Sequence, residues 1–160
     1  MPSANRRLLL TSLGSVAVGS LAGCTGVTSD ELPAGSLRFE NEHELPHVIA
    51  MRVTDIGSGP GDGPGAVVGH PSVVPAQRNL SASASVEPGE SKTYEGVFTE
   101  PVWYAVQFTV DGRKPHEETC ATVFHPAPAN EKDGTFLSGK VYDSGEFSWV
   151  VSSTENEGSF

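Results

Sequence analysis

The segment V-W-Y-A-V-Q-F-T-V-D-G, Val102 to Gly112, decides the fold class of this 160-residue chain. Its first nine residues, Val102–Val110, are rich in aromatic and β-branched side chains, which predicts a β-strand. Asp111-Gly112 follows directly, and this dipeptide is typical of the turn in a β-hairpin. We therefore expect the chain to reverse here and Glu117–Phe124 to pair back.

Similar patterns of alternating apolar and polar residues recur on both sides of this segment. Downstream, a second hairpin is expected around the turn Asp143-Ser144-Gly145. Upstream, Glu87-Pro88-Gly89-Glu90 has Pro and Gly in the positions that a type II turn prefers, so the strand after it is expected to return beside the strand before it. The remaining expected strands are Leu37–Glu42, Val48–Thr54, Leu80–Val86, Ser91–Phe98, Phe136–Tyr142 and Glu146–Val151.

These short strands, separated by turn signals, predict an all-β fold: an antiparallel β-sandwich of about seven to eight strands over residues 37–152, followed by a polar tail, 153–160. No segment after residue 24 has a sustained helical period, so helix content should be low. The aromatic residues expected in the core are Trp103, Tyr104, Phe108, Phe124, Phe136, Tyr142, Phe147 and Trp149.

The pattern V-x-P-G-E-S-x-x-Y at Val86–Tyr94, with the later Tyr104-x-Val106 and the V-D-G turn, resembles immunoglobulin-like domains. The paired cysteines of antibody domains are absent, so the resemblance implies a shared architecture only. A cupredoxin-type barrel is the nearest alternative. Ile56–Ala66 is rich in Gly and Pro, which predicts a long mobile loop that continues neither a strand nor a helix.

The first residues have the layout of an export signal, with a basic pair and then an apolar stretch, Leu8–Ala22, too short for a comfortable membrane span. Arg6 and Arg7 are compatible with twin-arginine export. Leu21-Ala22-Gly23-Cys24 resembles the lipobox of exported lipoproteins. That resemblance implies a signal peptide over 1–23, cleavage before Cys24, a lipid on the Cys24 thiol, and a tether over 24–36. A plain signal peptide or an uncleaved anchor is the alternative.

Charge is strongly asymmetric, because Arg6 and Arg7 are two of only ten basic residues, and all 20 acidic residues follow Cys24. This balance excludes the basic patch that a nucleic-acid-binding protein needs. An acidic surface stays hydrated and soluble, and its self-repulsion is screened by salt, which favours a high-salt habitat. An ordinary acidic surface or an acid-rich region facing a partner is the alternative. Together with the signal, the acidic chain resembles haloarchaeal surface lipoproteins, which implies an outward-facing location on the cell membrane.

No motif for catalysis is found: the chain has no G-x-S-x-G elbow, and we expect a non-catalytic binding or envelope-structural domain without a cofactor. The alternative is a cupredoxin-like copper or electron-transfer protein, in which Cys120 and His125, at C-x₄-H spacing, would bind the metal with His43 or His47. That family's downstream Met is missing. Cys120 also fits a buried strand position, and lipidation of Cys24 would leave it without a cysteine partner for a disulfide within the chain.

Two further features are candidates for binding or modification. Glu40, Glu42 and Glu44 would share one face of an extended strand, where they could bind a hard cation or form a solvated, charged sheet face. Asn79-Leu80-Ser81 is the one N-x-[ST] sequence in the chain, so Asn79 is a candidate acceptor for N-linked glycan. The sequence identifies no particular protein or small-molecule partner.

Overall fold

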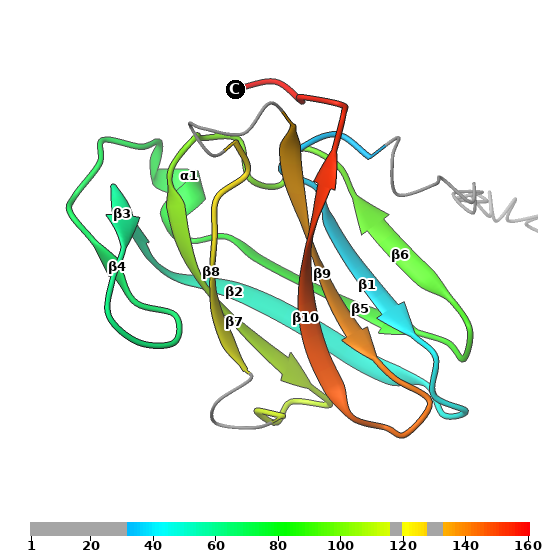
Figure 1. Cartoon of the computed structure of the whole chain (residues 1–160). Coiled ribbons are helices and arrows are strands. Elements are labelled where there is room, and N and C mark those ends of the chain that lie inside the picture. The colour runs from blue at the N-terminus through cyan, green and yellow to red at the C-terminus, as the bar shows by residue number, and fades with distance from the viewer. Residues whose placement is uncertain (1–31, 116–119, 128–132) are drawn as a thin grey trace, which may run out of the picture.

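The computed structural model describes residues 32–115, 120–127 and 133–160, and almost all regular structure within them is β-strand. Eight strands form two four-stranded sheets, of order β10-β9-β1-β6 and β5-β2-β7-β8, which pack face to face (Figure 1). The expected all-β sandwich is confirmed. The elements are β1 (Leu37–Asn41), β2 (His47–Gly57), β3 (Gly59–Pro60), β4 (Val67–Val68), α1 (Pro75–Arg78), β5 (Ser81–Val86), β6 (Ser91–Tyr94), β7 (Trp103–Val110), β8 (Ala121–Phe124), β9 (Gly134–Val141) and β10 (Phe147–Thr154).

Strand β1 lies between β6 and β9 and runs parallel to β9, with Leu37 opposite Leu137 and Asn41 opposite Val141. The other strand pairs in the described residues are antiparallel. They include the two hairpins expected from sequence, β7–β8 and β9–β10. The structure therefore shows a sandwich of two packed four-stranded sheets.

The core is built from side chains at alternate positions of both sheets. The Phe98 ring lies 5.0 Å from Tyr104 and 4.7 Å from Phe124, and the Phe108 ring lies 5.3 Å from Phe147. Removing one such side chain from water stabilises the fold by about 1.5–3 kcal/mol. Of the aromatic residues expected inside, five are buried, whereas Trp103, Tyr142 and Trp149 are partly exposed; the buried five are Tyr104, Phe108, Phe124, Phe136 and Phe147.

The turn Glu87–Glu90 forms as expected, with Gly89 at φ +74°, but the expected hairpin between β5 and β6 is wrong. The turn carries the chain from one sheet to the other, so β5 pairs with β2 and β6 pairs with β1. Asn41, at the end of β1, stabilises this connection between the two sheets. Its backbone N–H donates to the Glu90 carbonyl (3.0 Å), and its carbonyl accepts from the Gly89 N–H (2.8 Å).

The glycine- and proline-rich segment is more regular than expected. Strand β2 continues to Gly57, and β3 and β4 form a small hairpin in which the Ser58 N–H donates to the Val68 carbonyl (2.7 Å). Glycine is required at position 57, because a Cβ there would come within 2.6 Å of the Val67 Cβ. The prediction that this segment forms no strand is therefore wrong.

The packed domain is wider than the expected span of 37–152. Leu32 and Ala34, placed in the tether from sequence, are buried. The Ala34 N–H donates to the Asn156 carbonyl (2.8 Å), and the Thr154 hydroxyl donates to the Leu32 carbonyl (2.6 Å). Hydrogen bonds thus join the segment 32–34 to the segment 154–156, so residues of the expected tether and tail belong to the fold.

The sandwich has two ends, which we call the entry end and the distal end. The entry end carries residues 32–36, where the described chain begins, and the distal end carries the turns 42–46, 87–90, 111–113 and 142–146 (Figure 1). Strand β1 runs from the entry end to the distal end. Within the described residues, no helix is long and apolar enough to cross a membrane.

Candidate functional site

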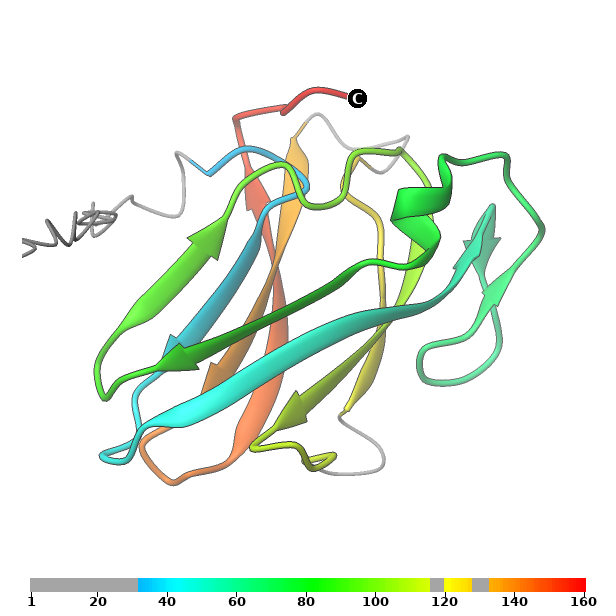
Figure 2. The same ribbon diagram turned by 180° about the vertical axis from the view of Figure 1, so that it is seen from behind.

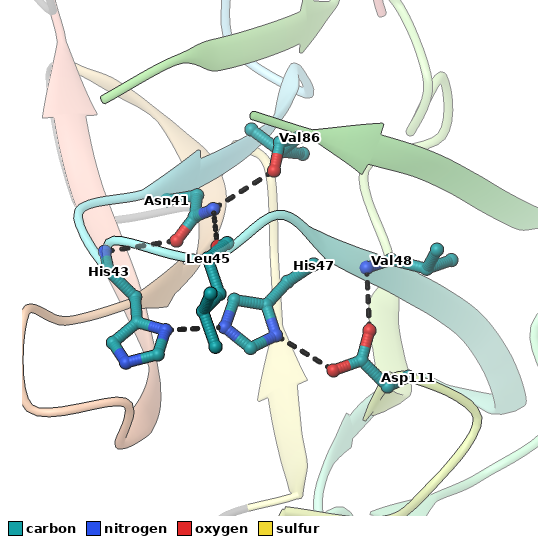
Figure 3. A network of polar contacts seen from close by, with 7 residues as sticks. All are labelled: Asn41, His43, Leu45, His47, Val48, Val86 and Asp111. Atoms are coloured by element: carbon teal, nitrogen blue, oxygen red, sulfur yellow. Dashed lines mark hydrogen bonds and ion pairs between the residues drawn. The ribbon is translucent and has the colours of Figure 1, made fainter. Parts of the chain in front are cut away.

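Three titratable side chains form a continuous hydrogen-bonded row at the distal end, which we call the His–His–Asp chain (Figure 3). His43 lies in the β1–β2 turn, His47 begins β2, and Asp111 lies in the β7–β8 turn. His43 Nδ1 lies 2.9 Å from His47 Nε2, and His47 Nδ1 lies 2.7 Å from Asp111 Oδ2. The imidazoles are partly buried and their ring centroids are 5.0 Å apart.

The position of Asp111 follows from the hairpin turn recognised in the sequence. Asp111 and Gly112 have φ of +51° and +74°, the left-handed values that a type I′ turn requires at both central positions. This backbone directs the carboxylate toward β2, where Oδ1 accepts from the Val48 N–H (2.9 Å). The Val48 N–H, and next the contact with His47, hold the pKa of Asp111 below its ordinary value.

The position of His43 depends on the buried side chain of Asn41. Its Nδ2 donates to the carbonyls of Leu45 (2.8 Å) and Val86 (2.9 Å), and its Oδ1 accepts from the His43 N–H (3.0 Å). One amide therefore shapes the β1–β2 turn and ties it to the end of β5. This arrangement brings His43 back over His47.

The ionised carboxylate of Asp111 determines which ring nitrogens carry hydrogen. Since Asp111 can only accept, His47 must donate from Nδ1, and a neutral His47 then accepts at Nε2. His43 must therefore donate from Nδ1, which leaves its Nε2 as the basic end of the chain.

The His43 imidazole forms the outer end of this row. That imidazole lies against the β9–β10 turn, since a Cβ built on Gly145 would stand 3.5 Å from His43 Nε2. Within the described residues, no group of three or more His, Cys, Asp or Glu side chains is placed to hold a metal ion.

Cys120 and His125, the alternative copper ligands, are not brought together. Cys120 is buried just before β8, whereas His125 directly follows it, so a whole extended strand separates them, about 16 Å at 3.3 Å per residue. His125 lies at the entry end beside Trp103 (5.1 Å between ring centroids), and burial lowers its pKa. His43 and His47 lie at the other end. His70 is exposed. His116 lies outside the described residues.

The glutamates of the first strand face protein cations. Lys140 Nζ lies 2.7 Å from Glu42 and 3.8 Å from Glu40, and Arg38 Nε lies 3.1 Å from Glu40. The hydrogen bond to Glu42, and then the charge of Glu40, raise the pKa of Lys140. Glu44 lies beyond the end of β1 in the exposed turn. Of the two alternatives, the geometry fits a charged sheet face paired within the protein.

The candidate glycan acceptor is accessible, since Asn79 and Ser81 are both exposed between α1 and the start of β5. The export and anchoring residues Arg6, Arg7, Leu21, Ala22, Gly23 and Cys24 lie outside the described residues. Searches for a matching family model, a matching curated protein and a matching solved structure find none for this chain.

Sequence reasoning found two members of the His–His–Asp chain but not the chain itself. His43 and His47 flank Pro46, so their approach is open on sequence grounds, while Asp111 is recognisable only as a turn residue. The missing information is the pairing of β2 with β7, which places Val48 beside Asp111. The sequence signal that could have identified Asp111 is the aspartate of an Asp-Gly hairpin turn. A carboxylate in such a turn is free to accept a hydrogen bond from a neighbouring strand.

Proposed function

We propose that this protein is an exported lipoprotein, anchored outside the cell membrane by a lipid on Cys24, whose β-sandwich is a non-catalytic binding or envelope-structural domain. The observation that carries the proposal is the order of features at the start of the chain. The basic pair Arg6-Arg7, an apolar stretch and Leu21-Ala22-Gly23-Cys24 follow one another as in exported lipoproteins.

The geometry of the domain supports this attachment. Cys24 precedes Leu32, the first described and already buried residue, by only eight positions. An extended chain of that length spans at most about 29 Å. A lipid on Cys24 therefore keeps the entry end close to the membrane surface, and the distal end is the part of the sandwich turned away from it.

The distal end has the features expected of a surface that faces other molecules. Leu45 is 57% exposed at the tip of the β1–β2 turn, and that turn is fixed by Asn41 and the His–His–Asp chain. Turns held on a rigid sheet scaffold are common positions for binding residues. The surrounding exposed carboxylates give the end a negative potential; they are Glu42, Glu44, Glu87, Glu90, Asp111, Asp143 and Glu146.

The proposal is tested by fractionating cells that express the full chain with Cys24→Ala or, as the matched control, Cys120→Ala. The wild type and the Cys120 variant are expected in the membrane fraction, with the domain digested by protease added outside intact cells. The Cys24 variant is expected to lose membrane attachment. Equal membrane retention of both variants would contradict the lipid anchor, and protection of the wild type from external protease would contradict the outward location.

A further inference from the structure

We propose that Asn79 carries an N-linked glycan and that this glycan shields the open edge of β5 against pairing with other chains. The inference rests on the proposed export of the domain. Asn79 is the C-cap residue directly after α1, and its acceptor sequence Asn79-Leu80-Ser81 leads directly into β5; in Figure 2 the short green helix continues into the darker green strand beside the cyan β2. Both Asn79 and Ser81 are exposed.

The local contacts of Asn79 are compatible with modification of the folded domain. Its side-chain Nδ2 donates one hydrogen bond, to the Pro75 carbonyl at 3.2 Å, and an amide nitrogen carries two hydrogens. In the transfer, Nδ2 bonds to the anomeric carbon of a sugar carried on a lipid phosphate. The carbon–oxygen bond to phosphate breaks, the lipid phosphate leaves, and Nδ2 loses one proton. The remaining N–H can still donate to Pro75.

Strand β5 has an edge that the described part of the chain leaves open. It pairs with β2 on one side, in continuous register from Ser81 opposite Arg52 to Val86 opposite His47, and no described strand covers its other side. The six residues contain no charge, no proline and no bulge, which are the usual protections of a sheet edge. The serines at positions 81, 83 and 85 are exposed.

The other edge strands differ from β5 in charge, in length or in having no glycan acceptor sequence beside them. Strand β6 carries the charge of Lys92, and β8 has four residues. The segment after β3 also lies against β8, since a Cβ on Gly65 would come within 2.9 Å of the Ala121 Cβ. Strand β10 is uncharged like β5, but no glycan acceptor sequence lies beside it, so it provides an internal control.

A glycan on Asn79 stands where a further strand would have to pass. Asn79 is two residues before Ser81, the first residue of β5, and a glycan is bulky and strongly hydrated. A strand added to the outside of β5 would extend beyond its short length and meet the glycan at this end. Loss of the glycan changes nothing at β10, so association that appears on its loss must start near β5.

The modification is tested on full-length protein purified from the membranes of the cells that make it, by mass spectrometry of the proteolytic peptide containing Asn79. The expected result is a sugar mass on Asn79, absent in Asn79→Gln and Ser81→Ala and retained in Ser81→Thr, which keeps the hydroxyl. An unmodified Asn79 in the wild type overturns the proposal.

The shielding role is tested by sedimentation velocity of the detergent-solubilised full-length proteins. We expect Asn79→Gln to form several-fold more oligomer than the wild type. Adding Ser85→Lys, which puts a charge on β5 opposite exposed Val48, should return it to the wild-type level. Val150→Lys, on β10, should not. Rescue by Val150→Lys instead, or no added oligomer in Asn79→Gln, would refute shielding of β5.

The N-terminal peptide from the same digest separates this proposal from the proposed function. A lipid on Cys24 with an unmodified Asn79 refutes the glycan alone. A sugar on Asn79 with an unlipidated N-terminus refutes the anchor but supports the glycan.

Discussion

Replacing Asp111 by asparagine reverses the direction of the hydrogen bonds in the His–His–Asp chain. Asparagine tolerates the φ of +51° at this position, and its Oδ1 can still accept from the Val48 N–H. Its NH₂ group, however, now donates to His47 Nδ1. His47 must then carry its hydrogen on Nε2 and donate to His43 Nδ1, so both rings change tautomer.

The energetic cost follows from replacing one charge-assisted hydrogen bond by a neutral one. Bonds to charged groups contribute about 1.5–3 kcal/mol and neutral ones about 0.5–1.5 kcal/mol. Because the Asp111 side chain is 51% exposed, solvent screening reduces the difference, and we expect a loss of about 1 kcal/mol in the free energy of unfolding at pH 7.

The contribution of Asp111 to the free energy of unfolding depends on pH. Contacts in the folded state hold the pKa of Asp111 below its ordinary value, so the carboxylate stabilises the fold above that ordinary value, and its contribution is lost as the pH falls through the folded-state pKa. Asp111→Asn should remove this part of the acid dependence. Denaturant unfolding between pH 3 and pH 7, and ¹⁵N NMR of the imidazoles, measure the two effects. Unchanged tautomers together with unchanged stability would refute the assigned hydrogen-bond chain.

Four other predictions concern burial, titration and surface charge. Asn41→Ala removes three hydrogen bonds that shape the β1–β2 turn and tie it to Val86, each contributing about 1 kcal/mol, so denaturant unfolding should show a loss of about 3 kcal/mol, with Glu42→Gln as a control that loses less than about 1 kcal/mol. Burial raises the pKa of Tyr104 to about 12, so stability should fall by roughly 2–3 kcal/mol as the pH rises from 10 to 12, and Tyr104→Phe should abolish this loss. Cys120 is 3% exposed, so a thiol reagent should label it slowly in native protein and rapidly in denaturant; fast native labelling would contradict its burial. Raising NaCl from 0.1 to 1 M shortens the screening length from about 10 to 3 Å and weakens repulsion among the distal carboxylates, so the melting temperature should rise; an unchanged or lower melting temperature would contradict this.

Strand positions were predictable because they depend on local patterns. The aromatic and β-branched run at Val102–Val110 and the turn Asp111-Gly112 specify a strand and its reversal without knowledge of the rest of the chain. The partner of each strand depends on distant residues. The turn Glu87–Glu90 looks like a hairpin in sequence, yet it crosses between sheets because Asn41, far away in the chain, binds its backbone.

The candidate site was predictable in its residues more than in its geometry. His43 and His47 are near in sequence, and the turn between them permits contact. Asp111 is 64 residues from His47, and only the antiparallel pairing of β2 with β7 brings them together. Cys120 and His125 show the reverse. They are close in sequence, at C-x₄-H spacing, but an extended strand keeps them apart in space.

The proposed function requires Cys24 to be a processed and lipidated N-terminus, and the mass of the N-terminal peptide of the mature protein measures this. We expect this peptide to begin at Cys24 and to carry a lipid mass that is removed from the thiol by chemical cleavage. An unmodified peptide that begins before Cys24, or one that begins at Cys24 without a lipid, would contradict it.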